Sequence, residues 1–257
     1  MGNNVKLLDL LVRKIRDYDA TRGYTCDACG RELFEYPEKR LCDDCSSSLR
    51  YNDGYTCQKC GRKTVTESVC LTCKQILPPF TKGFSPLDYS GKSAALVNRL
   101  KNGDPRLALF LGERMTETFL SAYTGGKTEF LLLPVPLSKE RKRIRGYNQA
   151  ELLCESILRG LEERSYTVEY ARDLLIKKEN TESQKDLHYK ERFETAEKAY
   201  TVANRQLCKG KTALLIDDIC TTGATGGACA KKLLSAGAEE VFFLSAASLA
   251  EIKRDPQ

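Results

Sequence analysis

Eight cysteines, arranged as four C-x-x-C pairs between residues 26 and 73, constrain the fold of this chain more than any other feature. Paired thiols in a chain without a secretion signal indicate metal binding rather than disulfides, because a reducing compartment keeps thiols free. Four thiolates suit a tetrahedral zinc ion in a closed structural site. The sequence therefore predicts two structural zinc ions, one held by Cys26, Cys29, Cys42 and Cys45 and the other by Cys57, Cys60, Cys70 and Cys73.

This pairing scheme has alternatives. Sequential pairing places one ion in each unit, whereas a cross-braced arrangement shares the ligands of each ion between the two units. Instead of zinc, the cysteines could hold iron–sulfur clusters or remain unmetallated thiols. Residues 1–80 contain 13 Lys and Arg residues against 11 Asp and Glu residues, and each thiolate-bound zinc ion adds negative charge. Nucleic-acid binding by this segment is therefore not favoured, and its expected role is to stabilise a module too short for its own core.

The composition of the chain is typical of a globular protein. Of its 257 residues, 41% are hydrophobic, enough for a substantial core. No apolar run approaches the roughly 18 residues of a transmembrane helix, and the charged, helically periodic N-terminus is not typical of a signal peptide. We therefore expect a cytoplasmic protein without membrane insertion. The net charge of +6 permits phosphate contacts, and the single histidine, His188, disfavours histidine-centred catalysis.

Apolar strands alternate with amphipathic helices after the cysteine units. Strands are expected at 130–135, 213–217 and 241–248, with a short one within 167–176, and helices at 93–122 with a break at 102–105, at 147–163 and at 223–236. This alternation is typical of a parallel α/β sheet covered by helices on both faces. With Pro78 and Pro79 as a seam, we predict an amphipathic helix at 1–23, a double zinc-binding module at 24–77 and an α/β domain at 80–250.

The stretch ALLIDDICTTGAT at 213–225 predicts a phosphate site at the carboxyl edge of this sheet. A helix should begin near Gly223, and its free N–H groups suit a phosphate together with the nearby hydroxyls of Thr221, Thr222 and Thr225. Asp217 and Asp218 suit the vicinal hydroxyls of a sugar, directly or through Mg²⁺. The implied ligand is a ribose 5-phosphate, since the Walker and dinucleotide-binding motifs do not occur here.

Residues 213–225 resemble the phosphoribosyl pyrophosphate loop of type I phosphoribosyltransferases, and the whole chain resembles the ComF family. The resemblance rests on the paired C-x-x-C-G units, LKNGDPRLALFLG at 100–112, PVPLSKERKRIRGYNQAELL at 134–153 and ALLIDDICTTGATGGACAKKLLSAGA at 213–238. It implies a double zinc ribbon followed by a type I phosphoribosyltransferase-like domain. It also implies that phosphoribosyl pyrophosphate binds with Mg²⁺ at Asp217, Asp218, Thr221, Thr222, Gly223, Ala224 and Thr225.

The same resemblance assigns two further segments. The basic stretch SKERKRIRGYNQ is expected to form a loop that holds pyrophosphate through Lys139, Arg143, Arg145, Asn148 and Gln149. A basic patch for nucleic-acid backbone and a solvated face are the alternatives for this stretch. Residues 177–200 correspond to a hood over the active site, whose motif is met by Thr181, Gln184 and Arg192, while Glu194 replaces an Asn of the family pattern.

These features lead to one functional expectation and one rival. The expectation is a phosphoribosyltransferase in which a nitrogen nucleophile displaces pyrophosphate from the ribose, associated by resemblance with competence and DNA uptake. The rival is a non-catalytic protein, either a sensor of a phosphoribosyl ligand or a handler of single-stranded DNA alongside other competence proteins. A basic stretch with only Tyr147 close to it is a weak single-strand signature.

Overall fold

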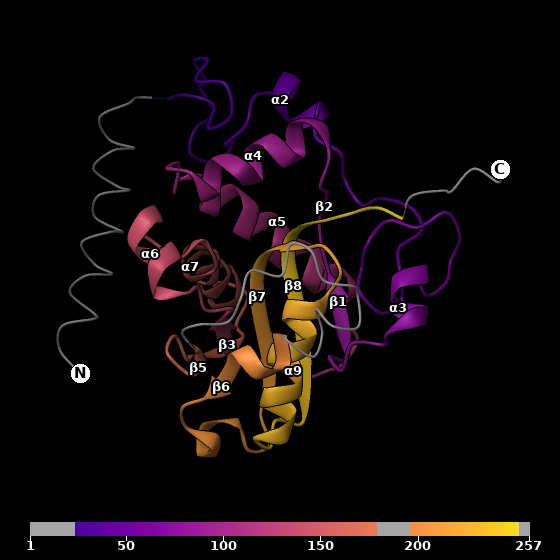
Figure 1. The fold of residues 1–257 in the computed structure, drawn as a ribbon. Coiled ribbons are helices and arrows are strands. Elements are labelled where there is room, and N and C mark those ends of the chain that lie inside the picture. The colour runs from indigo at the N-terminus through magenta and orange to yellow at the C-terminus, as the bar shows by residue number, and fades with distance from the viewer. Residues whose placement is uncertain (1–23, 179–195, 252–257) are drawn as a thin grey trace.

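A parallel β-sheet forms the centre of the computed structural model, which describes residues 24–178 and 196–251 (Figure 1). The strand order is β1-β8-β7-β3-β4, with β2 also paired to β8, and every pairing in this sheet is parallel. The strands span Lys82–Phe84 (β1), Leu87–Asp88 (β2), Glu129–Pro134 (β3), Thr167–Tyr170 (β4), Thr212–Cys220 (β7) and Glu240–Ser248 (β8). A separate antiparallel pair joins β5 (Leu175–Lys177) to β6 (Tyr200–Val202).

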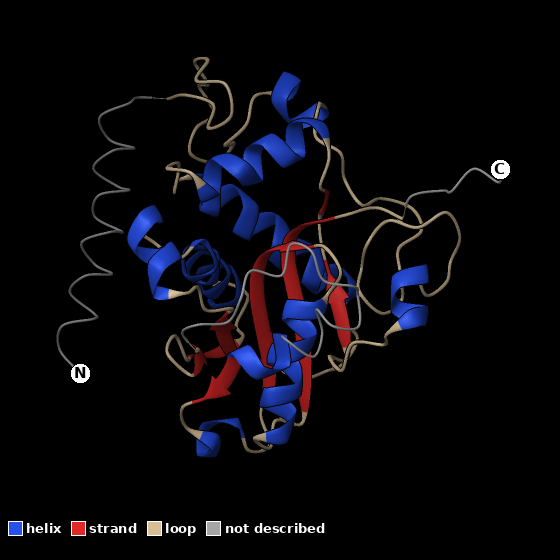
Figure 2. Cartoon of the chain, viewed as in Figure 1, coloured by secondary structure: helices blue, strands red, loops and turns tan. Residues whose placement is uncertain are grey.

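Helices cover both faces of the sheet, as Figure 2 shows. On one face, α4 (Gly91–Lys101), α5 (Leu107–Ala122) and α7 (Gln149–Glu162) share a core with Leu132 and Leu214. On the other face, α9 (Ala224–Ser235) and the β5-β6 pair share a core with Leu131 and Leu215. Neighbouring residues of β3 and β7 thus enter different cores, as the two-residue period of a strand requires. The expected α/β class is confirmed.

Small residues bring α9 close to the sheet. A Cβ atom added at Gly226 would lie 2.9 Å from the ring of Phe243 on β8, so only glycine allows this approach. Gly237, with a φ of +105°, follows the end of α9. Elsewhere, a short 3₁₀ helix, η2 (Arg205–Cys208), precedes β7. The close packing of α9 on β8 holds the start of the helix, and the loop before it, against the sheet.

The two tetra-cysteine units pack on opposite faces of the sheet. Cys26 and Cys42 of the first unit belong to the core of α4, α5 and α7, whereas all four cysteines of the second belong to the core of α9. The short helices of the units, α2 (Asp43–Ser47) and α3 (Leu71–Gln75), accordingly lie far apart in Figure 1. Phe80, just after the expected seam, is fully buried and stacks on Phe243. Both units are therefore docked on the sheet; the domain boundaries stay a prediction.

Three of the expected elements differ in the structure, and β1, β2 and β6 were not expected. β7 continues to Cys220, so that Asp217 and Asp218 lie inside the strand, because β8 is long enough to pair with it up to Ser248. The basic stretch forms a short helix, α6 (Lys139–Arg145), instead of a loop; the Ser138 side chain caps its start and Gly146, with a φ of 79°, caps its end. Residues 167–176 contribute to two strands, β4 and β5, which belong to different sheets.

Some expectations fall outside the described residues. These are the helix at 1–23 and the hood positions Thr181, Gln184, Arg192 and Glu194, together with His188. Within residues 24–178 and 196–251, none of the helices combines the length and the apolar character needed to cross a membrane.

Candidate functional site

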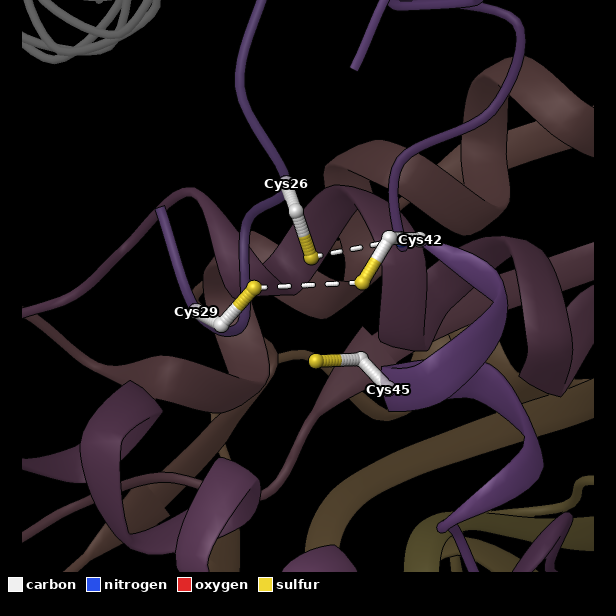
Figure 3. Close-up of side chains that lie close together, drawn as sticks. All are labelled: Cys26, Cys29, Cys42 and Cys45. Atoms are coloured by element: carbon white, nitrogen blue, oxygen red, sulfur yellow. Dashed lines mark hydrogen bonds between the residues drawn. The ribbon is translucent and has the colours of Figure 1, made fainter. Parts of the chain in front are cut away.

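Each tetra-cysteine unit gathers its own four thiols, so sequential pairing is confirmed and the cross-braced alternative is wrong. In both units the four ligand atoms lie within 4.8 Å of one another, and Figure 3 shows the sulfurs of the first unit converging. The Sγ atoms of Cys29 and Cys42 lie 3.8 Å apart, as do those of Cys60 and Cys70. Four sulfurs bonded at about 2.3 Å to one zinc ion would lie about 3.8 Å from each other, so both units fit a tetrahedral metal ion.

Backbone N–H groups support the thiols of both units. The amide of Cys42 donates to Cys26 Sγ at 3.3 Å, and the amide of Cys70 donates to Cys57 Sγ at 3.2 Å. These donors favour the thiolate form that binds metal. The units differ in exposure, because Cys29 is exposed whereas all four cysteines of the second unit are buried. The second centre is therefore the more enclosed of the two.

Asp218 lies at the point where β3 ends and β7 continues. In the described residues, β3 pairs with β7 only as far as Pro134 opposite Ile216. Beyond that point side chains reach β7: Gln149 Nε2 donates to Asp218 Oδ2 at 2.5 Å, and Lys101 Nζ lies 3.3 Å from Asp218 Oδ1. The buried Asp218 carboxylate is thus held from α7 and from the end of α4, which offsets the cost of burying its charge.

Asp217 has a different environment. Its Oδ1 accepts a hydrogen bond from the amide of Asp218 at 2.9 Å. Burial and the neighbouring charge of Asp218 raise the pKa of Asp217 to about 8, against the opposing effects of Lys101 and Lys177. The Asp217 carboxyl therefore retains a proton at neutral pH in the ligand-free protein, while Asp218 is bound to its two partners. The two acids are adjacent in sequence but not equivalent.

The loop after β7 turns directly into α9. Gly223 precedes the helix in the left-handed conformation, with a φ of 77°, which a residue with a side chain adopts at a cost. Thr222 Oγ1 accepts a hydrogen bond from the amide of Ala224 at 3.3 Å. Thr221 is exposed and Thr225 is half-buried. Threonine hydroxyls and the start of α9 thus follow Asp217 and Asp218 directly in the chain, the order expected of a phosphate site.

The basic stretch divides into exposed cations and buried amides. Lys139 and Arg143 are exposed on α6, and Arg145 is half-buried. The Asn148 side chain caps α7, since its Oδ1 accepts from Ala150 N and its Nδ2 donates to Val135 O, both at 3.1 Å. Asn148 and Gln149 therefore position α7 and Asp218 here, and direct contact with pyrophosphate stays a prediction for the five residues named.

Three residues near the acid pair were missed by sequence reasoning. Lys101 ends α4, and Lys177 and Tyr200 face each other across the β5-β6 pair, with Lys177 Nζ 5.7 Å from the ring centroid of Tyr200. Burial lowers the pKa of Lys177, as does the nearby charge of Arg141 from α6. Lys101 lies in the LKNGD motif, whereas Lys177 and Tyr200 belong to the separate β5-β6 pair, and the charge of Asp217 acts on both of them.

The fold and the site define a class: a parallel α/β protein with an acid pair in a central strand, a glycine turn into a helix and two tetra-cysteine centres. The chain belongs to the ComF family. It is 30% identical over 222 residues to competence protein ComFC of Bacillus subtilis (strain 168), covering 83% of this chain and 86% of that protein. It is 27% identical over 204 residues to DNA utilization protein YhgH of Escherichia coli O157:H7, covering 78% of this chain and 87% of that protein.

The chain matches no protein-family model. A solved structure of a hypoxanthine phosphoribosyl transferase from Trypanosoma cruzi is 12% identical and has a TM-score of 0.35. The match covers 64% of this chain and 70% of that one. A TM-score this low carries no argument about the site.

Proposed function

We propose that this protein binds phosphoribosyl pyrophosphate with Mg²⁺ at the carboxyl edge of β7 and transfers the phosphoribosyl group to a nitrogen nucleophile. The observation that carries the proposal is one continuous segment: the acid pair inside β7, the threonine loop, and Gly223 at the start of α9. An anionic phosphate suits the amides and the positive end of α9, whereas sugar hydroxyls suit carboxylates.

The roles of the residues follow from their positions. The loop at 221–225 binds the 5-phosphate through amides and hydroxyls, and Asp217 accepts hydrogen bonds from the ribose hydroxyls. Asp218 is held by Gln149 and Lys101 and acts as the fixed negative charge next to Asp217. Mg²⁺, when bound with the ligand, supplies positive charge to the pyrophosphate. The cations of α6 face the same leaving group.

The proposed reaction is a displacement at the anomeric carbon. The bond from C1 to the pyrophosphate oxygen breaks and its electron pair leaves with pyrophosphate. The lone pair of the nitrogen nucleophile forms the new bond to C1, and a proton on that nitrogen is released to solvent. No covalent bond to the protein forms, so catalysis is by positioning and charge stabilisation.

Calorimetry with phosphoribosyl pyrophosphate and Mg²⁺ tests the site. At pH 9, above the pKa of Asp217, we expect micromolar binding by the wild type and binding weaker by about tenfold or more in Asp217→Asn, because one charge-assisted hydrogen bond is removed. Asp173→Asn is the matched control, since Asp173 is an exposed acid after β4. No binding by the wild type, or equal binding by both variants, would contradict the proposal.

Two zinc ions and a cytoplasmic location belong to the same proposal, since thiolate ligands survive where thiols stay reduced. A role in competence or DNA use is supported by the names of the relatives. Other competence proteins as partners are part of the proposal.

A second candidate function is binding of single-stranded DNA by α6. The specific observation is the exposed helical surface of Lys139, Arg141, Arg143 and Ile144. Charge reversal in Arg141→Glu with Arg143→Glu should weaken DNA binding and flatten its salt dependence. If salt-sensitive DNA binding occurs and phosphoribosyl pyrophosphate does not bind, this second function replaces the first.

A further inference from the structure

The two tetra-cysteine units carry an arginine at the same position, directly after C-x-x-C-G, and the fold uses the two differently. Arg31 of the first unit is exposed and pairs with Asp44 of that unit at 2.5 Å. Arg62 of the second unit is only 5% exposed. Because the local sequence around both arginines is alike, the difference arises from what each unit is docked against.

Arg62 bridges the second metal centre and the candidate phosphate loop. Its Nε donates to the ligand sulfur of Cys60 at 3.3 Å, and one terminal nitrogen donates to Thr72 Oγ1 at 3.3 Å. The other terminal nitrogen donates to the backbone carbonyl of Thr221 at 2.5 Å, 159 residues away in sequence. A single guanidinium therefore contacts a metal ligand and the first residue of the loop.

The second unit provides a rigid base for this bridge. The amide of Gly83 on β1 donates to the carbonyl of Lys59 at 2.7 Å. A Cβ atom at Gly61 would lie 2.5 Å from Gly83 O, and one at Gly83 would lie 2.7 Å from Cys60 O. The backbone of the unit thus touches the backbone of β1, and β1 is bonded through β8 to β7. Arg62 cannot move far from the loop without breaking these contacts.

The Arg62 contact decides which way a loop peptide faces. The carbonyl of Cys220 is held by the amide of Leu249 at 3.1 Å, and the next carbonyl, that of Thr221, is held by Arg62. In a trans peptide the carbonyl and the following N–H point in opposite directions. Fixing Thr221 O toward the metal centre therefore aims the Thr222 N–H away from that centre.

We infer that Arg62 is a positioning residue that couples the second tetra-cysteine centre to the phosphate loop. Metal-bound thiolates carry net negative charge, which balances the buried guanidinium and keeps it on Thr221 O. Loss of the metal would release Cys60 Sγ from its fixed position and weaken its hydrogen bond to Arg62 Nε, so the guanidinium would hold the Thr221 carbonyl less firmly. The effect on ligand affinity rests on the proposed function, whereas the effect on the loop does not.

The test uses the full chain in the variants Arg62→Lys and Arg31→Lys. Lysine keeps the charge but cannot reach Cys60, Thr72 and Thr221 together, because it lacks the planar fork of arginine. Metal content should stay at two ions per chain in both variants. Amide hydrogen exchange over residues 221–225 should become about tenfold faster in Arg62→Lys, because one charge-assisted hydrogen bond to the loop is lost. In Arg31→Lys it should stay unchanged. Exchange in β3 should not change in either variant.

The second readout is calorimetric affinity for phosphoribosyl pyrophosphate with Mg²⁺, which should weaken about tenfold in Arg62→Lys alone. If the wild type does not bind this ligand, the proposed function fails while the exchange result still decides the coupling. Loop exchange equal to wild type, with both metal ions retained, would overturn the inference. If Arg62→Lys loses metal or does not fold, Thr72→Val decides instead: it removes one anchor of Arg62, and unchanged loop exchange there overturns the coupling.

Discussion

The Gln149 side chain donates a hydrogen bond to Asp218, with Nε2 2.5 Å from Oδ2, across the point where β3 stops pairing with β7. Gln149 is the first residue of α7 and is itself buried. The bond joins the helix to the acid pair. In the described part of the chain, the hydrogen bond to Asp217 comes from the backbone amide of Asp218, not from a side-chain amide. The orientation of the Asp218 side chain therefore depends on the position of the first residue of α7.

Replacing Gln149 with Leu should destabilise the protein. The near-isosteric side chain fills the space but leaves Asp218 Oδ2 without its donor, which costs about 1–3 kcal/mol. The free energy of unfolding in urea is the measurement. Gln206→Leu is the control, because Gln206 lies on the exposed 3₁₀ helix and should change stability by about 0.5 kcal/mol or less. Equal stability of the Gln149 variant and the wild type would show that the bond contributes nothing net.

The stability of the ligand-free protein should depend on pH through Asp217. Its pKa is raised from 3.8 to about 8 in the folded state. Between these values the folded protein holds a proton that the unfolded chain releases, so this group's contribution to stability falls as the pH rises toward 8. Asp217→Asn removes the dependence. The melting temperature of the variant, relative to wild type, should increase from pH 5 to pH 8; an identical difference at both values contradicts this assignment.

Metal content should follow the observed grouping of the cysteines. Replacing all four cysteines of the first unit with Ser should leave one bound ion per chain, because the second unit gathers four thiols of its own. The reciprocal replacement of Cys57, Cys60, Cys70 and Cys73 should also leave one. Atomic spectroscopy of the purified variants measures this, and the melting temperature should fall in both, since metal binding contributes to folding. Loss of both ions from the first variant would contradict independent centres.

Gly83→Ala should separate the second unit from the sheet. The new Cβ atom would lie 2.7 Å from Cys60 O, a backbone atom that cannot rotate away. We expect a loss of about 1–3 kcal/mol, the usual cost of overpacking, in the free energy of unfolding. Gly160→Ala on α7 is the control: its Cβ would lie 3.2 Å from the Thr116 side chain, and the alanine favours the helix. Equal effects of the two substitutions would argue against a special contact at β1.

Features that depend on residues close in sequence could be predicted. The two cysteines of each C-x-x-C pair are close in sequence. With sequential pairing, their spacing therefore predicted two groups of four ligands. The apolar runs of β3, β7 and β8 and the helical period of α7 and α9 appeared at their positions, since each pattern repeats over neighbouring residues. The end of β7 was missed, because its length depends on how far β8 continues beside it.

Hydrogen bonds between distant segments were decided only by the tertiary structure. Asn148 and Gln149 were expected to face a ligand, yet in the ligand-free fold one caps α7 and the other binds Asp218, 69 residues away. Arg31 and Arg62 occupy the same place in a repeated motif, yet Arg31 pairs with Asp44 of its own unit whereas Arg62 reaches Thr221 in the loop before α9. The sequence by itself determined which local units form and which eight cysteines are candidate metal ligands, whereas the tertiary structure showed that each unit gathers its own four. The tertiary structure decided which partner each buried polar group finds, because that choice depends on which surfaces the packed sheet brings together.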